Sequence, residues 1–275
     1  MKKALTYNLG ENLIEKIADF ISDIFGKENN DFSRIAVVFG GKRPSLFLKR
    51  ALAARIKKAF YPPHSFTIDE FMQYIISKDF IFEKLGELDA SYFIYRLAKQ
   101  KAMPILKGRE KFSEFLPWAR QIHSFIEQVD LENIDDKSLA HVEKSASIGY
   151  DIPPSINVLL EHTNTIRLAY HNYLAKEKRY SRGWIYLEAS KLVKERNFDE
   201  FDAIVFCNFF YLHKTELEVM KEIHRKDKAF FIFQGKNSQW PVLAKNAQEL
   251  NISIAPEKET TAQPKLSLYQ GFDMH

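Results

Sequence analysis

The stretch Arg34–Leu52, RIAVVFGGKRPSLFLKRAL, constrains the fold more than any other part of this chain of 275 residues. Its first part, Ile35–Phe39, is an apolar run with almost no polar alternation, which is typical of a strand buried on both faces of a parallel sheet. A glycine pair and a basic pair follow, and then Pro44, a residue favoured in the first turn of a helix. We therefore predict a strand, a tight loop and a helix, the arrangement from which α/β folds are built.

The loop Gly40–Arg43 has the layout of a phosphate-binding loop but not its residues. Such a loop reads G-x-x-x-x-G-K-[ST], because several backbone N–H groups surround the phosphates while a hydroxyl reaches Mg²⁺. Here only two glycines precede Lys42, and Arg43 stands where the hydroxyl should be. Two interpretations remain open: a phosphate site at a helix N-terminus, where partial positive charge and free N–H groups gather, or a tight turn with solvated basic residues.

Short apolar runs alternate with helix-period segments at both ends of the chain. We expect strands at Ile35–Phe39, His64–Thr67, Ala203–Cys207, Ala229–Phe233, Ile252–Ala255 and Lys265–Gln270. We expect helices at Asn12–Phe25, Pro44–Phe60, Ile68–Lys78, Thr215–His224 and Trp240–Leu250, the third of them capped by Thr67 with Glu70 at a capping-box spacing. This alternation indicates right-handed βαβ units and a parallel sheet.

The pattern changes in the middle of the chain, where strand signals almost vanish. Long helix-period segments are found at Ala90–Met103, Glu110–Val129, Ser155–Lys176 and Trp184–Lys194, and the polar stretch Glu132–Pro154 indicates a loop or a weak helix. We therefore predict an α/β fold: a P-loop-NTPase-like parallel sheet flanked by helices, with a large all-helical insertion. The sheet domain would be discontinuous, comprising residues 1–79 and 200–275, and the insertion would comprise residues 80–199.

Composition narrows the classes of function. A formal net charge of +4 allows an anionic partner without requiring one. The single cysteine, Cys207, excludes an intramolecular disulfide and a cysteine-rich zinc site, and its apolar surroundings in AIVFCNFF predict a buried thiol. No segment approaches the ~18 apolar residues of a membrane span, and the first residues do not have the pattern of a signal peptide. We expect a cytoplasmic protein with no membrane partner and no metal site.

Three predicted strand ends carry the residues with the most chemical interest, because open α/β sheets bind ligands at the carboxyl ends of their strands. The first is Gly40–Arg43. The second is Cys207-Asn208, where an asparagine cannot act as a general base and a thiol is a poor ligand for Mg²⁺. The third lies in FIFQGKNSQW, where Gly235 follows the strand and Gln239 comes four residues later.

In their order along the chain, these segments resemble the motifs of superfamily 1 DNA helicases. Those enzymes carry a P-loop, a strand that ends in Asp-Glu-x-Gln, and a later strand followed by Gly-Asp-x-x-Gln. On that pattern Lys42 falls near the P-loop lysine, and Cys207 and Asn208 fall on the Asp-Glu pair. Lys236 replaces the aspartate of the third motif, while Gln239 matches its glutamine. The frame is kept and most of the catalytic residues are replaced.

This combination resembles the inactivated helicase-like N-terminal region of the B subunit of AddAB-type helicase–nucleases. In that family a P-x-[KR]-R-like segment often replaces the P-loop. The family's PP-x-x-x-T-x-x-x-F/L and G-x-x-Y elements correspond here to Pro62–Met72 and Gly183–Tyr186. Relatives are longer and continue into a second helicase-like domain and a PD-(D/E)XK nuclease, so we expect this chain to be the N-terminal part of such a protein.

The resemblance implies a non-catalytic module of a complex that processes DNA double-strand breaks. The module would scaffold a helicase–nuclease partner subunit and contact the DNA backbone, single-stranded or at a duplex end, while the parent protein would be an exonuclease or helicase subunit. The candidate DNA- or phosphate-binding residues are Gly41, Lys42, Arg43, Ser65, Thr67 and Gln239. The degenerate nucleotide-site positions are Lys42, Cys207, Asn208 and Lys236. We expect no catalytic residue and no cofactor in this chain, ATP and Mg²⁺ included.

The segment between Gly40 and Pro63 supports this interpretation, because all of its charged residues are basic. They are Lys42, Arg43, Lys49, Arg50, Arg55, Lys57 and Lys58. We expect these cations to face outward while apolar residues face the core, namely Leu46, Phe47, Leu52, Ile56 and Phe60. The cations would contact a nucleic-acid backbone or simply form a solvated helix face.

Two other functions remain open. The first is an ATP-binding, helicase-type domain with a divergent P-loop, which would need a carboxylate for Mg²⁺; Asp69, Glu70 and Glu216 are the nearest candidates in the sequence. The second is a protein-interaction scaffold whose helical insertion supplies the interface. Aromatic residues could stack on bases or belong to the core, and they are Trp184, Tyr186, Phe209, Phe210, Tyr211 and Trp240.

Overall fold

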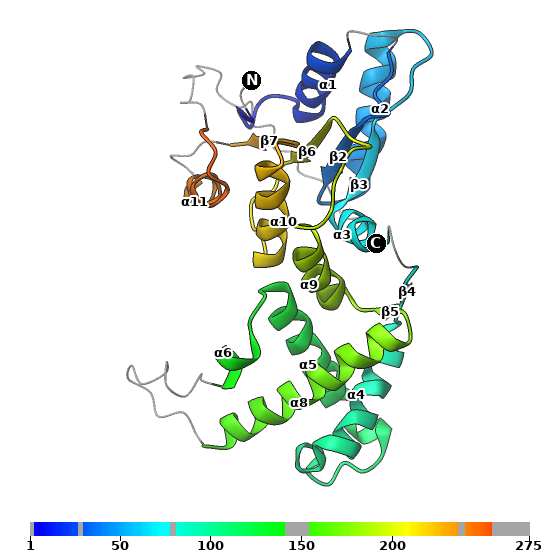
Figure 1. Ribbon diagram of the computed structural model, residues 1–275, viewed down its shortest axis with the longest axis vertical. Coiled ribbons are helices and arrows are strands. Elements are labelled where there is room, and N and C mark those ends of the chain that lie inside the picture. The colour runs from blue at the N-terminus through cyan, green and yellow to red at the C-terminus, as the bar shows by residue number, and fades with distance from the viewer. Residues whose placement is uncertain (1–2, 27–29, 78–80, 141–153, 236–239, 255–275) are drawn as a thin grey trace, which may run out of the picture. The chain divides into compact units, whose positions relative to one another are not determined.

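The computed structural model describes residues 3–26, 30–77, 81–140, 154–235 and 240–254, without the side chains of 140 and 154–157. The chain divides into two compact units, each made of segments that lie far apart in the sequence (Figure 1). Unit 1 consists of Met1–Ser65, Glu200–Phe210 and Ala229–His275, and unit 2 consists of Phe66–Asp199 and Tyr211–Lys228.

A five-stranded sheet with the strand order β1-β7-β6-β2-β3 forms the centre of unit 1. Its strands are β1 (Ala4–Tyr7), β2 (Ile35–Phe39), β3 (His64–Thr67), β6 (Ala203–Cys207) and β7 (Ala229–Gln234). β1 pairs with β7, β7 with β6, and β6 with β2, each pair in parallel. The α/β class and the parallel sheet that the sequence predicts are confirmed.

Two helices of unit 1, α1 (Leu13–Phe25) and α2 (Arg43–Ile56), contact each other and share one apolar cluster with the sheet. Val37, Val205 and Ile232 contribute to this cluster from β2, β6 and β7. All residues of β2 and β6 are buried, so both faces of these strands are covered. That burial explains why the strands have continuous apolar sequences instead of alternating ones.

One predicted helix end and one predicted strand in unit 1 are wrong, and the backbone explains both. The helix expected to reach Phe60 ends at Ile56, because Lys57 adopts a left-handed conformation (φ 52°) that closes α2. The strand expected at Ile252–Ala255 is absent from residues 252–254. Asn251 closes α11 (Pro241–Leu250) in a left-handed conformation, and the Ile252 N–H donates to the Ala247 carbonyl. Residue 255 and the strand expected at 265–270 lie outside the described residues.

Unit 2 is mainly helical. Its helices are α3 (Ile68–Ser77), α4 (Glu87–Lys101), η1 (Met103–Leu106), α5 (Phe112–Leu131), α6 (Asp136–Ala140), α8 (Pro154–Lys176), α9 (Arg182–Leu192) and α10 (Lys214–Arg225). β4 (Glu83–Lys84) and β5 (Arg179–Tyr180) form a small parallel pair. Compared with the expected division at residues 79 and 200, this unit also takes in α3 and α10.

Within unit 2, α4 contacts α5 and α8, while α9 contacts α3, α5 and α10. The capping box predicted at the start of α3 is confirmed: the Thr67 N–H donates to Glu70 Oε2, and the Glu70 N–H donates to Thr67 Oγ1. Gly183 is required for close packing, because a Cβ there would lie 2.8 Å from the Glu127 carbonyl oxygen. Among the described residues, no helix combines the length and the apolar character that crossing a membrane requires.

Candidate functional site

The candidate site lies at the carboxyl edge of the sheet in unit 1, where β2 and β6 end side by side. Phe39 of β2 is paired with Cys207 of β6, so the next residues, Gly40 and Asn208, leave neighbouring strands at the same edge. From β2 the chain continues to β3 on one side, and from β6 it continues to β7 on the other. Such a reversal of strand order is the topological switch point at which open α/β sheets bind ligands.

The glycine pair of the loop is open to solvent. Gly40 and Gly41 are both exposed, and a Cβ built on either would have no atom within 4 Å. Neither glycine has a positive φ. A loop that cradles phosphates arranges successive N–H groups through a left-handed residue, and this loop has none. The geometry therefore suits contact with one phosphate at a helix start better than enclosure of a triphosphate.

The first turn of α2 contributes no acidic residue to the positive end of the helix dipole. Lys42 is the N-cap and makes no capping hydrogen bond through its side chain, and the first turn contains no acidic residue. Pro44 has no N–H to offer, while the Ser45 hydroxyl donates to the Lys42 carbonyl at 2.6 Å. Lys42 and Arg43 are both exposed. Together they form an anion-attracting corner of the sheet edge.

The cations of α2 fall into two groups. Arg43, Lys49 and Arg50 are exposed and form no ion pair within the part of the chain that the structure describes. Arg55 instead lies 2.6 Å from Glu15 and 2.8 Å from Asp19, both on α1, so it serves to hold α1 and α2 together. The outward basic face is therefore smaller than the sequence predicts.

The prediction that Leu46 and Phe47 face the core is wrong. Their exposed fractions are 52% and 50%, respectively. The buried stripe of α2 consists of Leu48, Ala51 and Leu52, whose i, i+3, i+4 spacing fixes which side of the helix meets the sheet. Leu46 and Phe47 fall outside that stripe. Exposed apolar side chains therefore share the first turns of α2 with exposed cations.

At the end of β6, the backbone conformation explains Asn208 and the packing of the core explains Cys207. Asn208 has a φ of 62°, and its N–H donates to the Ile232 carbonyl at 2.7 Å. Asparagine tolerates this left-handed conformation better than most residues. Cys207 is buried, as predicted, and burial raises the pKa of its thiol far above the usual range. The thiol is therefore protonated and a poor nucleophile at neutral pH.

The end of β7 also has a structural role. Gly235 has a φ of 126°, which favours glycine, and a Cβ there would lie 3.3 Å from the Trp240 ring. The Gln234 amide donates to the Asn8 carbonyl at 3.2 Å and to the Glu11 carbonyl at 2.9 Å. These contacts tie β7 to the loop after β1. Two predicted site residues, at positions 236 and 239, lie outside the described residues.

The hydroxyl group of Ser65 is buried and that of Thr67 is engaged in a helix cap. The Ser65 hydroxyl oxygen is buried and has no hydrogen-bond partner among the described residues, so it does not face solvent. Thr67 belongs to unit 2, where its hydroxyl accepts the capping bond from Glu70. Of the predicted DNA-binding residues, the structure brings together Gly41, Lys42 and Arg43.

The aromatic candidates divide by burial. Trp184, Tyr186 and Phe209 are buried and contribute to the cores of their units. Tyr211 and Trp240 are exposed large side chains. The ring of Trp240 lies beside the ring of Phe210 in unit 1, with 5.7 Å between the two centroids. The backbone carbonyl of Phe210 accepts a hydrogen bond from the Asn246 side chain.

The three carboxylates considered as ligands for Mg²⁺ form hydrogen bonds within unit 2. Asp69 is exposed and accepts hydrogen bonds from Arg182 and Tyr186, and these bonds outweigh partial desolvation and lower the pKa of its carboxyl group. Glu70 belongs to the capping box at the start of α3. Glu216 is buried and accepts the His213 N–H in a capping box at the start of α10.

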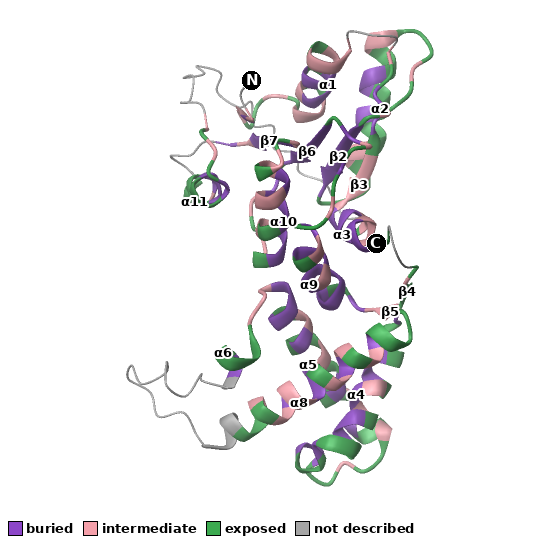
Figure 2. Ribbon diagram, viewed as in Figure 1, coloured by how far each residue is buried: buried purple, intermediate pink, exposed green. Residues whose placement is uncertain are grey.

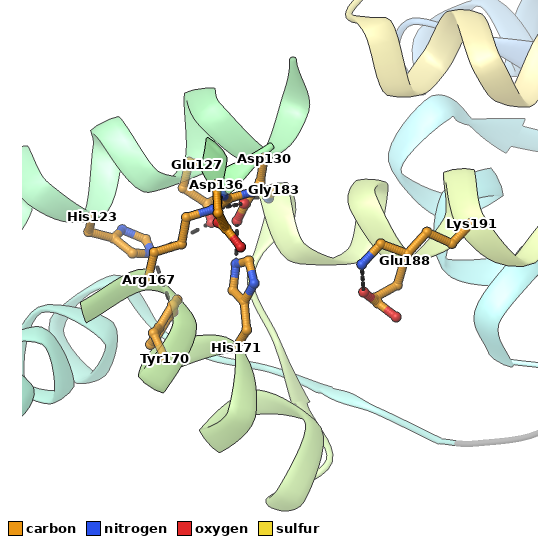
Figure 3. Close-up of polar contacts among 10 residues, drawn as sticks. All are labelled: His123, Glu127, Asp130, Asp136, Arg167, Tyr170, His171, Gly183, Glu188 and Lys191. Carbon is orange, nitrogen blue, oxygen red and sulfur yellow. Dashed lines mark hydrogen bonds and ion pairs between the residues drawn. The ribbon is translucent and has the colours of Figure 1, made fainter. Parts of the chain in front are cut away.

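Unit 2 contains a buried polar cluster that the sequence pattern does not predict (Figure 3). Asp130 of α5 is fully buried, and its carboxylate accepts a hydrogen bond from Arg167 Nε at 2.7 Å and contacts His171 Nε2 at 2.8 Å. Arg167 also contacts Asp136 of α6 at 2.9 Å. In the sequence, the i, i+4 spacing of Arg167 and His171 shows only that they share a helix face. It does not reveal that Asp130, on another helix, is their partner. The cluster joins α5, α6 and α8.

No group of three or more His, Cys, Asp or Glu side chains could hold a metal ion within the described ranges. The sequence matches no model of a known protein family, and no curated protein matches it. The functional proposal therefore depends on the residues and geometry of the sheet edge.

Proposed function

We propose that unit 1 is a non-catalytic, helicase-like module that contacts the phosphate backbone of DNA through Lys42 and Arg43. The chain would act in the cytoplasm, in a complex that processes DNA double-strand breaks, and would scaffold a helicase–nuclease partner subunit. The observation that carries the proposal is the pairing of β2 with β6. It places an exposed basic helix start at the switch point of the sheet, beside a strand end without a carboxylate.

The geometry of the degenerate positions favours binding without turnover. Hydrolysis of a nucleotide needs hard oxygen ligands for Mg²⁺ and a group that positions water. The position after β6 is taken by Asn208 in a left-handed conformation, and the thiol before it is buried. The open glycine pair offers no cradle for a triphosphate.

The mixture of side chains at the start of α2 favours a nucleic acid over a small anion. Exposed Lys42 and Arg43 suit phosphates, while exposed Phe47 suits a base or sugar. Sequence-independent binding of single strands combines these two features: a positive surface along the backbone and aromatic side chains for the bases.

Fluorescence anisotropy tests the proposal with a labelled single-stranded oligonucleotide and a duplex of the same sequence, each in a salt series. We expect binding at low salt that weakens as salt rises. Replacing Lys42 and Arg43 together by alanine should reduce the log–log salt slope on the single strand by about 0.7 for each phosphate that the variant no longer neutralises. The pair Lys49→Ala with Arg50→Ala removes the same charge from the same helix and should have the smaller effect.

Two outcomes would contradict DNA binding at this site: no binding at low salt, or binding that the Lys42→Ala, Arg43→Ala variant leaves unchanged. A calorimetric titration with ATP and Mg²⁺ addresses the alternative. Saturable binding of ATP that depends on Lys42 would favour a divergent nucleotide site, whereas DNA binding without ATP binding supports the proposal.

A further inference from the structure

We propose that a groove between α5 and α8 in unit 2 binds an amphipathic helix of a partner protein, with an acidic residue of that helix against Lys107 and Arg109. The proposal deepens the scaffolding part of the proposed function and rests on it. It concerns unit 2 alone, and its evidence is independent of the DNA-contacting corner in unit 1.

Two adjoining hollows form the groove. One has a volume of about 380 Å³ and the other about 250 Å³, and both are lined by Trp118 of α5 and Leu159 of α8. Pro104 and Ile105 of η1 line the first hollow, and Ile122 lines the second. Because the hollows share two lining residues, they form one continuous depression.

The packing of the helices explains why the groove stays open. α5 and α8 both contact α4. The buried cluster of Asp130, Arg167 and His171 closes the space between them further along both helices (Figure 3). The residues that line the hollows come earlier in both helices, before this cluster. A second helix could therefore lie between them without displacing the cluster.

Several apolar side chains that line the groove are exposed, and α5 and α8 each carry exposed as well as buried residues (Figure 2). The exposed fractions are 38% for Trp118, 40% for Phe125 and 50% for Val158. Trp118, Ile122 and Phe125 are spaced i, i+4, i+7 on α5, so they form one face. A groove with such anchors suits the apolar face of a helical segment, which is a recurring mode of peptide recognition. Contiguous apolar surface of this kind marks interaction sites.

The charge of the groove determines which helix would fit. Among the described residues that line the two hollows, Lys107 carries the only formal charge, and none is a carboxylate. Arg109 follows Lys107 by two residues, and its guanidinium group lies 5.0 Å from the centroid of the Trp118 ring. A carboxylate on the partner would complement both cations beside an apolar surface, where partial desolvation strengthens the attraction.

A peptide-display selection on the full chain tests this proposal. The expected result is enrichment of peptides with apolar residues at i, i+3 or i+4, and i+7 and an acidic residue at one end. The strongest binder is then labelled and measured by anisotropy. Leu159→Glu should weaken its binding at least tenfold, which is typical of an interface hot spot. Lys107→Glu should weaken it several-fold, and more so at low salt.

Matched controls lie on the same helix. Leu168→Glu replaces an exposed leucine of α8 that lines neither hollow, and Lys176→Glu reverses a charge in the last turn of α8. Both variants should bind the peptide as the wild type does. All four variants should bind DNA normally, so weakened peptide binding with intact DNA binding separates this proposal from the rest of the proposed function.

Several results would overturn the proposal. One is a selection that enriches nothing, and another is a selected peptide whose binding is unchanged in Leu159→Glu. If the selected peptides lack acidic residues, or if the Lys107→Glu variant binds the selected peptide as the wild type does, an acidic partner helix is excluded. A dimer in sedimentation that Leu159→Glu converts to a monomer would make a second copy of the chain the occupant. Binding seen only after residues 141–153 are replaced by a Gly/Ser linker would make that segment the occupant.

Discussion

Asn208 illustrates how a single residue can carry two kinds of information. In the resemblance to helicase motifs it corresponds to a glutamate, which would mean that a catalytic group is missing. By conformation it is a left-handed residue at the end of a strand, where asparagine is well suited (φ 62°). Cys207 is similar, since its side chain belongs to the apolar cluster of unit 1. Backbone geometry and packing are sufficient to explain both residues.

Glu216 gives a residue-scale prediction that depends on pH. Burial raises the pKa of its carboxyl group, although the His213 N–H and nearby positive charge oppose the shift. The folded state therefore holds this proton more tightly than the unfolded chain does. The resulting stability is fully present below the unfolded pKa of about 4.3, and it is lost as pH rises through the folded pKa.

The Glu216→Gln variant keeps an oxygen acceptor for the His213 N–H and removes the ionisation. Its free energy of unfolding should therefore exceed that of the wild type increasingly as pH rises above about 4.3, the unfolded value for glutamate. Urea unfolding measured across a pH series checks this. Glu218→Gln, at an exposed position of the same helix, is the matched control. A difference that shrinks as pH rises would contradict the prediction.

The sequence predicts individual residues well where local chemistry decides their role. The capping box of Thr67 and Glu70 and the buried Cys207 are examples, because a cap spacing and an apolar run are visible in a short window. The predicted burial of Leu46 and Phe47 is wrong, because the side of α2 that is buried depends on how the helix meets the sheet. The partner of Arg167 is likewise invisible in the sequence, since Asp130 lies on another helix.

At the scale of elements, the strands buried on both faces and the edge strand His64–Thr67 are predicted with correct bounds, whereas the other edge strand, β1, is not predicted. Ile35–Phe39 and Ala203–Cys207 have continuous apolar sequences that leave little ambiguity. β1 escapes prediction because Ala4–Tyr7 is short and only its first residue is buried. At Ile252 the sequence pattern is strand-like, but the residue donates to the last turn of α11. This local bond, which closes the helix, overrides the strand propensity of Ile252.

The loop between β2 and α2 gives a prediction at the same scale. Gly40→Ala and Gly41→Ala should leave stability unchanged or raise it by about 0.4–1 kcal/mol, because neither position needs a positive φ and alanine restricts the unfolded chain. Gly235→Ala should destabilise unit 1 by more than that, because its φ of 126° is strained for alanine and Trp240 is close. Urea unfolding of each variant measures these effects.

DNA binding gives the glycine variants a second test. A helix start that contacts one phosphate should tolerate alanine at positions 40 and 41, so anisotropy should show affinity within about twofold of the wild type, well below the 1.4 kcal/mol that a tenfold change represents. If the Gly40→Ala and Gly41→Ala variants lose both stability and DNA binding, the loop instead surrounds the phosphate and requires both glycines.

At the scale of the whole molecule, the division into two units differs from the one that the sequence predicts. The expected boundaries placed α3 and α10 with the sheet, because their sequences adjoin strands and have the pattern of βαβ units. In the structure, both helices have their contacts in unit 2, where α3 and α10 each pack against α9. Sequence adjacency cannot reveal which of two cores an amphipathic helix will join.

This division predicts that a core substitution in one unit reduces protection from hydrogen exchange in that unit and not in the other. Leu52 of α2 and Ile94 of α4 are each fully buried, one in each unit. Replacing either by alanine should cost about 2–5 kcal/mol, because a cavity remains in a packed core. Native-state hydrogen exchange should show reduced protection for Leu52→Ala in β2, β6 and β7, and for Ile94→Ala in α4, α5 and α8, since each unit has its own core. An equal reduction in both units, for either variant, would mean that the chain unfolds as one cooperative body.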